Sequence, residues 1–156
     1  MIEIDAIDRA LLRALVEDAG QSAGALARVL GMSQPVIWRR IKRLRDTGVI
    51  KGTRLRLDKA ALGFGVTVFL GIKLATKGRV SLDDFERAVT GIPEVQNVEH
   101  VLGLYDYRLR VVARDISDFE RILRRRIMTL AGVGDVEANV LLSEARRPGP
   151  LAALEI

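Results

Sequence analysis

The sequence predicts an α+β protein, in which a helix-turn-helix is followed by a ferredoxin-like β-α-β-β-α-β sandwich. Two observations carry this prediction: short helical periods in the first 50 residues, and a repeat in the remainder of the chain. Asp84-Phe85-Glu86-Arg87 recurs as Asp118-Phe119-Glu120-Arg121. Each copy lies in a predicted helix that is followed by a Gly or Pro turn and a Val-x-x-Val strand. This matched succession indicates two copies of one β-α-β unit.

The composition argues against several classes of functional site. A length of 156 residues with 49% hydrophobic side chains suits one ordinary domain or two small ones. Without Cys there are no disulfides, thiolate zinc sites or thiol nucleophiles, and a single His leaves little room for histidine-built metal sites. We therefore expect no metal and no cofactor. No apolar run approaches the ~18 residues of a membrane span, and no signal peptide is evident, so we expect a cytoplasmic protein without a membrane partner.

The positive charge is concentrated near the N-terminus. Residues 1–60 hold 12 basic and 7 acidic side chains, whereas residues 61–156 hold 13 of each. Nine of the basic groups fall between residues 39 and 59, against Asp46 and Asp58 alone. This concentration predicts a surface that binds a polyanion. The alternative is a solvated helix face, but a helix that needed only solubility would mix both signs.

Three helices are expected in the first domain, residues 1–50. The first runs from about Asp5 to Asp18. Ser22 caps the second, which Gly31 stops and whose inward residues are Leu26, Val29 and Leu30. Ser33 caps the third, which tolerates Pro35 in its first turn and runs to about Thr47. Two short helices joined by Gly31-Met32-Ser33 form a helix-turn-helix pattern.

The third helix has an apolar face and a cationic face. If it entered a major groove, Gln34, Trp38 and Arg39 would meet base edges, and Lys42 and Arg45 would lie nearer phosphates. For Trp38, packing against the first helix or another subunit is an equal alternative. Arg40 falls on the apolar side, which favours an internal ion pair or a tucked phosphate contact. The residues that we expect at DNA are Ser33, Gln34, Pro35, Trp38, Arg39, Lys42, Arg43 and Arg45.

Beyond the third helix the period changes. Apolar and basic residues alternate from Val49 to Leu57, which predicts a short exposed strand within a linker, residues 51–63. The second domain, residues 64–145, begins with a strand whose alternating apolar residues run from Val66 to Leu74, and a helix follows a cap at Ser81. Residues 146–156 are expected to form a C-terminal tail.

The sandwich leaves one face of its sheet without helices. The side chains expected there are Thr67, Phe69, Lys73, Val101 and Leu141. Because this mixed face suits solvent poorly, we infer a symmetric dimer that covers it. A dimer also suits a helix-turn-helix that reads two half-sites of double-stranded DNA.

Taken together, these segments resemble the Lrp/AsnC, or feast/famine, family of transcription regulators, over nearly the whole chain. The motifs that carry the resemblance are Ile7-Asp8-Arg9 with Leu11-Leu12, Ser33 with Arg40-Ile41-Lys42-Arg43-Leu44, Gly48-Val49-Ile50, Leu57-Asp58, Leu62-Gly63 and Gly103-Leu104-Tyr105-Asp106-Tyr107. The resemblance implies a winged helix-turn-helix, an effector-sensing second domain, dimers built through that domain and assembly into octamers. It also implies transcription regulation modulated by an amino acid.

The resemblance places the effector between dimers, near Gly103, Leu104, Tyr105 and Asp106. A glycine lets the backbone approach a ligand closely, and a carboxylate can pair with an ammonium group. The alternative is a plain hairpin turn with Asp106 on a solvated strand face. Leu104 replaces an acidic residue of many relatives, and Val136-Glu137-Ala138 replaces a Thr-x-Thr, so the ligand is either unusual or absent.

Two other functions compete with a specific regulator. Some haem-biosynthesis decarboxylases resemble the same family, but a single His and the cationic helix argue against a tetrapyrrole enzyme, and we expect no catalysis. A nucleoid-organising protein of low sequence preference differs only in degree. We expect His100 to be packed or paired rather than a ligand, and Arg124-Arg125-Arg126 to lie on a solvated helix.

Overall fold

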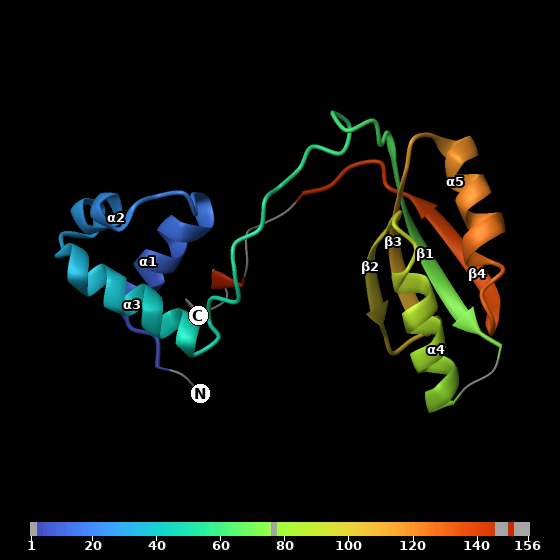
Figure 1. Ribbon diagram of the computed structural model, residues 1–156, viewed down its shortest axis with the longest axis horizontal. Helices are drawn as coiled ribbons and strands as arrows, with labels where there is room; N and C mark the ends of the chain where they lie inside the picture. The colour runs from blue at the N-terminus through green and yellow to red at the C-terminus, as the bar shows by residue number, and fades with distance from the viewer. Residues whose placement is uncertain (1–2, 76–77, 146–149, 152–156) are drawn as a thin grey trace. The chain divides into compact units, whose positions relative to one another are not determined.

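The computed structural model describes residues 3–75, 78–145, 150 and 151. The chain divides into two units: residues up to Arg56 together with the chain end from Ala145, and residues Leu57–Glu144 (Figure 1). The predicted tail, residues 146–156, falls almost wholly outside the described residues. Leu151 is described, and it packs against the core of the first unit.

The first unit contains three helices: α1 (Ala6–Glu17), α2 (Ala23–Leu30) and α3 (Gln34–Asp46). Asp5 caps α1 in a reciprocal capping box with Asp8, and the Ser22 side chain caps α2. Gly31 ends α2 in the left-handed region, at φ 63°, a conformation that glycine adopts without a Cβ clash. The core of the unit consists of Leu11, Leu12, Leu26, Ala27, Ile37 and Leu44.

Two predictions for the first unit and its linker are wrong. Val29 is 71% exposed, because the small residues Ala23 and Ala27 place the opposite edge of α2 against the core with Leu26. Residues 51–58 form no strand, although apolar and basic residues alternate there. Alternation marks a strand only where a neighbouring strand supplies hydrogen bonds, and no described residue pairs with this segment. Leu55 and Leu57 are consequently exposed.

The second unit is the predicted β-α-β-β-α-β sandwich. Its antiparallel sheet has the order β2-β3-β1-β4, formed by β1 (Val66–Leu74), β2 (Val95–His100), β3 (Tyr107–Ala113) and β4 (Val133–Val140). The central pair aligns Phe69 with Arg110 and Ile72 with Tyr107. Helix α4 (Arg79–Thr90) and helix α5 (Ile116–Ile122), which continues as the π-helical turn η1 (Leu123–Ile127), cover one face (Figure 1).

Both copies of the repeated tetrapeptide lie in helices, as the sequence predicts. The structure adds that Phe85 of α4 and Phe119 of α5 are both buried in the core against the sheet. The cap predicted at Ser81 is wrong: α4 begins at Arg79, after Gly78. A serine marks a helix start only if the preceding residues leave the helix, and nothing in the Arg79-Val80 backbone does so.

Candidate nucleic-acid interface and effector loop

The two faces of α3 are those that the sequence predicts. Ile37 and Leu44 are fully buried, whereas Trp38 is 60% exposed. The outward side also carries exposed side chains that are mostly cationic, namely Pro35, Arg39, Lys42 and Arg45. This surface therefore combines a large aromatic ring with positive charge, which suits contact with a nucleic acid.

The residues at the start of α3 differ in part from the prediction. Ser33 occupies the N-cap position with extended backbone, but its side chain accepts no capping hydrogen bond, so the predicted side-chain cap is wrong. Its hydroxyl is left for another partner. The Gln34 side chain lies beside Gly24 of α2, where a Cβ would meet its Oε1 at 3.8 Å. Lys42 pairs with Asp46 at 2.6 Å, and both side chains are largely exposed.

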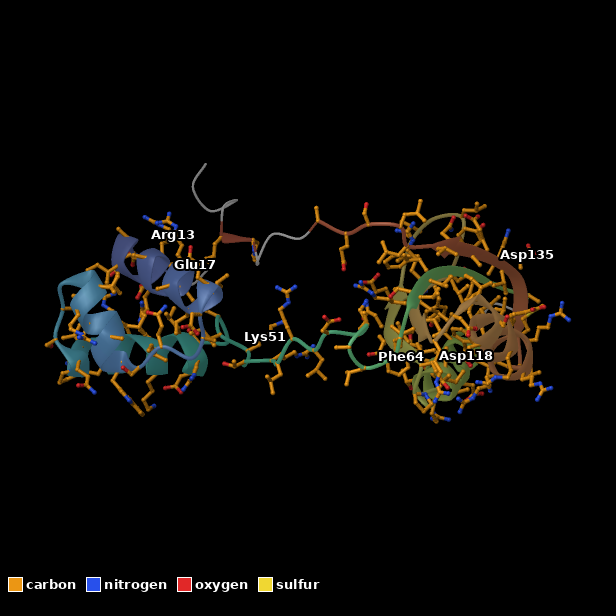
Figure 2. The ribbon with its side chains drawn as sticks, turned by 90° about the horizontal axis from the view of Figure 1, so that it is seen from above. Arg13, Glu17, Lys51, Phe64, Asp118 and Asp135 are labelled. Atoms are coloured by element: carbon orange, nitrogen blue, oxygen red, sulfur yellow. The ribbon has the colours of Figure 1, made fainter. Side chains whose placement is uncertain are left out.

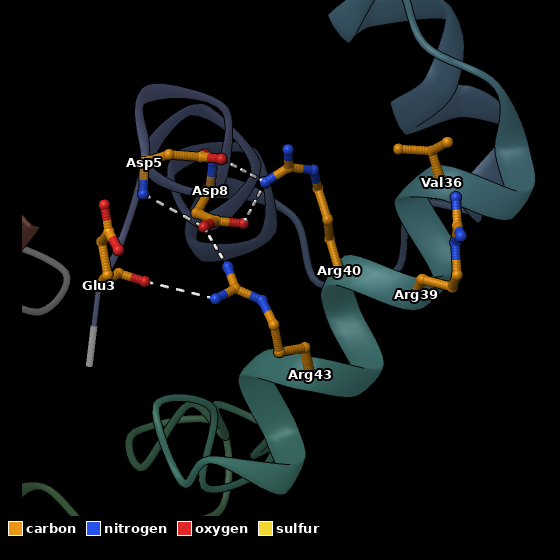
Figure 3. A pocket seen from close by; sticks show the side chains of 7 residues that line it. All are labelled: Glu3, Asp5, Asp8, Val36, Arg39, Arg40 and Arg43. Carbon is orange, nitrogen blue, oxygen red and sulfur yellow. Dashed lines mark hydrogen bonds and ion pairs between the residues drawn. The ribbon is translucent and has the colours of Figure 1, made fainter.

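Arg40 and Arg43 point the other way, into an acidic cluster at the start of α1 (Figure 3). The Arg40 Nη1 donates to Asp5 at 2.7 Å and to Asp8 at 2.8 Å. The Arg43 Nη2 donates to the second oxygen of Asp8, and its Nη1 donates to the Glu3 carbonyl at 3.3 Å. The internal ion pair predicted for Arg40 is confirmed. Arg43, which we predicted to contact DNA, also forms an ion pair with Asp8.

The electrostatics of this cluster follow from its contacts. Asp8 is completely buried, and each of its carboxylate oxygens receives a guanidinium. The Asp8 backbone N–H, followed by the Arg40 guanidinium, lowers the pKa of Asp5. Three acidic and three basic residues line the adjoining surface hollow of about 580 Å³, namely Glu3, Asp5, Asp8, Arg39, Arg40 and Arg43. The hollow is therefore formally neutral, and only Arg39 points away from the aspartates (Figure 3).

The sequence interpretation assigned no functional role to Asp8. A signal was present, because Asp8 lies four residues after Ile4, three before Leu11 and four before Leu12, on the apolar stripe of α1. A carboxylate on an inward stripe needs a buried cation. Arg40 was the candidate for that cation, because it lies on the apolar side of α3.

The proposed effector loop joins β2 to β3. Asp106 does not lie on a solvated strand face. Its backbone N–H donates to Ile72 at 2.9 Å, and its Oδ2 accepts from the Leu74 N–H at 2.8 Å. These bonds prolong the contact between the loop and β1. Gly103 has no atom within 4 Å of the position of a Cβ and no positive φ, so neither packing nor backbone conformation requires a glycine there.

Tyr105 lies flat across β1 on the face without helices. A Cβ on Gly71 would stand 2.6 Å from the ring, so only glycine permits this close approach. The Tyr105 hydroxyl donates to Glu137 of β4, which also accepts from Asn139 at 2.9 Å. The carboxylate raises the pKa of Tyr105, and the hydroxyl lowers the pKa of Glu137. Leu102 and Leu104 are exposed in the same loop.

The rest of the sheet face without helices is mixed in character. Phe69 is 37% exposed, with the Arg110 guanidinium 5.4 Å from its ring centroid. Arg110 also forms an ion pair with Glu144 at 2.9 Å. A cation held over an aromatic ring covers that ring only in part, so Phe69 retains apolar area for a further partner.

The structure also shows the surroundings of His100 and of the arginine run at residues 124–126. His100 is exposed, but its ring stacks on Tyr107 with centroids 4.9 Å apart, so the predicted packing contact is confirmed on one side of the ring. Arg124 pairs with Glu120, and Arg126 with Glu94. Within the described residues no group of acidic, His or Cys side chains is arranged to hold a metal ion. None of the helices in the same part of the chain has the length and hydropathy to cross a bilayer.

Comparison with protein families matches both units. A winged helix-turn-helix DNA-binding model matches residues 4–51, and the Lrp/AsnC ligand-binding domain matches residues 67–151. The DNA-binding transcriptional activator DecR of Escherichia coli is 32% identical over 143 residues, which cover 92% of this chain and 94% of that protein. The proline dehydrogenase transcriptional activator of Rhizobium radiobacter is 32% identical over 94% of each chain.

Solved structures agree with these matches. Escherichia coli AsnC superposes with a TM-score of 0.83 at 26% identity, over 94% of this chain and 97% of its own. The feast or famine regulatory protein of M. tuberculosis, solved with L-methionine, gives a TM-score of 0.81 at 28% identity, over 93% and 96%.

Proposed function

We propose, from the premise that the chain belongs to the Lrp/AsnC family, that this DNA-binding transcription regulator reads base sequence through the outward face of α3. The observation that carries the proposal is the division of the α3 cations. Arg40 and Arg43 are engaged by carboxylates, whereas Trp38, Arg39 and Arg45 are exposed with no partner shown among the described residues. Arg39 near the helix N-terminus suits a base contact, and Lys42 suits a phosphate.

Duplex selection tests this proposal. The full chain is incubated with a pool of random duplexes, and the enriched duplex is compared with random DNA at several salt concentrations. A sequence-specific regulator should prefer the enriched duplex by at least about 10³-fold. Equal affinities with a steep salt dependence would instead indicate a nucleoid-organising protein.

We also propose that an amino acid binds at the loop formed by Gly103, Leu104, Tyr105 and Asp106. One support is that neither backbone conformation nor packing requires a glycine at position 103, where the space around a Cβ is open. The other is that the M. tuberculosis relative was solved with L-methionine. Asp106 holds the loop on β1 through Leu74, so its carboxylate fixes the position of the loop. Backbone donors near Gly103 would then meet the carboxylate of the ligand.

Calorimetry of the full chain against the twenty amino acids tests the effector proposal. At least one should bind, and Gly103→Ala should weaken it about tenfold without lowering the melting temperature. No loss of stability is expected because the added methyl group meets no atom within 4 Å and alanine restricts the unfolded chain. Absence of binding by every amino acid would refute an amino-acid effector.

The proposal also covers the oligomeric state and the cellular location of the protein. The face around Phe69 supports a homodimer through the second unit, and dimers further assemble into octamers. Sedimentation of the full chain measures both states. The relatives reported above are named as regulators and not as decarboxylases, which supports a cytoplasmic protein that catalyses no reaction. A tetrapyrrole binding assay tests that remaining alternative.

A further inference from the structure

Two arginines one helical turn apart converge on a single buried carboxylate. Arg40 and Arg43 are three residues apart in α3, and each donates to a different oxygen of Asp8. Asp8 is fully buried, whereas the side chains of Arg40 and Arg43 are 22% and 44% exposed. The contact therefore lies on the side of α3 that faces the start of α1. Arg39 lines the same hollow, but its side chain points away from the aspartates (Figure 3).

This arrangement restrains α3 in a way that apolar packing does not. Contacts of Ile37 and Leu44 with the core are favourable but carry no directional preference. A guanidinium–carboxylate bond depends on direction as well as distance. Because the two arginines approach Asp8 from successive turns, rotating α3 about its axis lengthens at least one of the two bonds.

We propose that Asp8 is a positioning residue for DNA recognition, which holds the outward face of α3 in register by binding Arg40 and Arg43 from within. The inference rests on the proposed reading role of α3. Asp8 itself is buried and contacts no DNA; it acts through the orientation of Trp38, Arg39, Lys42 and Arg45. Arg43 is accordingly an anchor of the recognition helix rather than a phosphate contact.

The charge balance gives this role a distinctive signature. Asp5 and Asp8 neutralise Arg40 and Arg43, so these four groups add no net attraction for DNA. Asp8→Asn removes one negative charge and leaves a single carbonyl oxygen, which cannot accept both guanidiniums in the same geometry. Recognition of a particular sequence should weaken, while attraction to DNA of any sequence should not.

The experiment compares the selected duplex with random duplex for the full-length wild type and Asp8→Asn. We expect the selected duplex to lose at least tenfold in affinity. Random duplex should bind equally or more tightly, with a salt slope that steepens by about one. Glu17→Gln is the matched control, because Glu17, which is labelled in Figure 2, ends the same helix and is exposed. Its side chain has no hydrogen bond or ion pair shown among the described residues. This substitution removes the same charge and should leave the ratio of the two affinities unchanged.

A second variant guards against a folding defect. Arg43→Lys keeps the charge but loses the paired donors to Asp8 and Glu3. If Arg43 is an anchor, the ratio of the affinity for the selected duplex to that for random duplex should fall several-fold in Arg43→Lys, at an unchanged salt slope. If Arg43 contacts a phosphate, lysine should replace it and the ratio should stay the same. Thermal melting confirms that each variant is folded at the assay temperature.

The outcomes separate this inference from the proposed function. A wild type without sequence preference overturns both. A wild type with preference, and an Asp8→Asn or Arg43→Lys ratio equal to that of Glu17→Gln, overturns only the positioning role. Equal losses on selected and random duplexes in folded Asp8→Asn would indicate a general structural role and would also overturn it.

Discussion

Adding one methyl group at Gly71 tests the contact that places the proposed effector loop on the sheet. Its Cβ would stand 2.6 Å from Tyr105 Cδ2 and 2.7 Å from Cγ, both atoms of the flat ring. A real Cβ does not approach a ring carbon this closely, so Gly71→Ala must displace the Tyr105 side chain. Displacement also breaks the hydrogen bond from Tyr105 to Glu137.

The magnitude follows from two opposing effects. Overpacking costs about 1–3 kcal/mol of stability. Alanine also restricts the unfolded chain, which returns roughly 0.4–1 kcal/mol. We therefore expect Gly71→Ala to destabilise the second unit by about 1–2 kcal/mol. In a Tyr105→Ala background the clash is absent, and the same substitution should stabilise by up to about 1 kcal/mol.

Hydrogen exchange of β1 and β3 peptides in the full-length protein measures these changes within the second unit. Fluorescence of Trp38, the only tryptophan of the chain, follows the first unit as an internal control and should not change. The reasoning fails if Gly71→Ala has the same effect with and without Tyr105, because the coupling between the two sites would then be zero.

Three further predictions concern DNA, assembly and pH. Arg39→Ala should lose about 1–3 kcal/mol on the selected duplex and relax base preference, whereas Lys42→Ala should weaken selected and random duplexes alike, with a salt slope lower by about one in titrations. Phe69→Asp should shift sedimentation of the full chain from the wild-type assembly toward the monomer, because an unpaired carboxylate is costly to bury in an interface; an unchanged assembly would refute the sheet-to-sheet contact. The Arg114 N–H, followed by the Arg121 guanidinium, lowers the pKa of Asp118, so its contribution to stability is present above the unfolded pKa near 3.8 and is lost as pH falls through the folded value. Acid titration followed by circular dichroism should show a smaller loss below about pH 4 in Asp118→Asn than in wild type.

Hydrophobic periodicity was sufficient for most of the fold because each unit buries one face of each element. Ile37 and Leu44 lie on the inward face of α3, as their spacing predicts, and both copies of the repeat lie in helices. Periodicity failed where burial depends on residue size or on a partner strand. Ala27 is buried where Val29 was expected, because a small residue permits close helix packing.

The candidate sites were less predictable than the fold, because a side chain's role depends on what lies opposite it. The angular position of Arg40 indicated an internal contact, but Arg43 directly follows the outward Lys42, and nothing local identifies its partner. That partner is Asp8, more than thirty residues earlier. The alternative that placed Asp106 on a solvated strand face failed for the same reason, since the Leu74 N–H lies across the turn.

The arginine run at residues 124–126 shows why consecutive charges do not add up to a binding surface. Ile122 and Ile127 are both fully buried, although five residues of regular α-helix would separate their directions by about 140°. The π-helical turn η1 widens the helix so that both isoleucines face the sheet. The arginines of this run have different partners, because Arg124 reaches back to Glu120 while Arg126 reaches Glu94 before β2. Separate carboxylates therefore engage Arg124 and Arg126. On α3, by contrast, Asp5 and the buried Asp8 engage only Arg40 and Arg43, and Arg39 and Arg45 stay exposed.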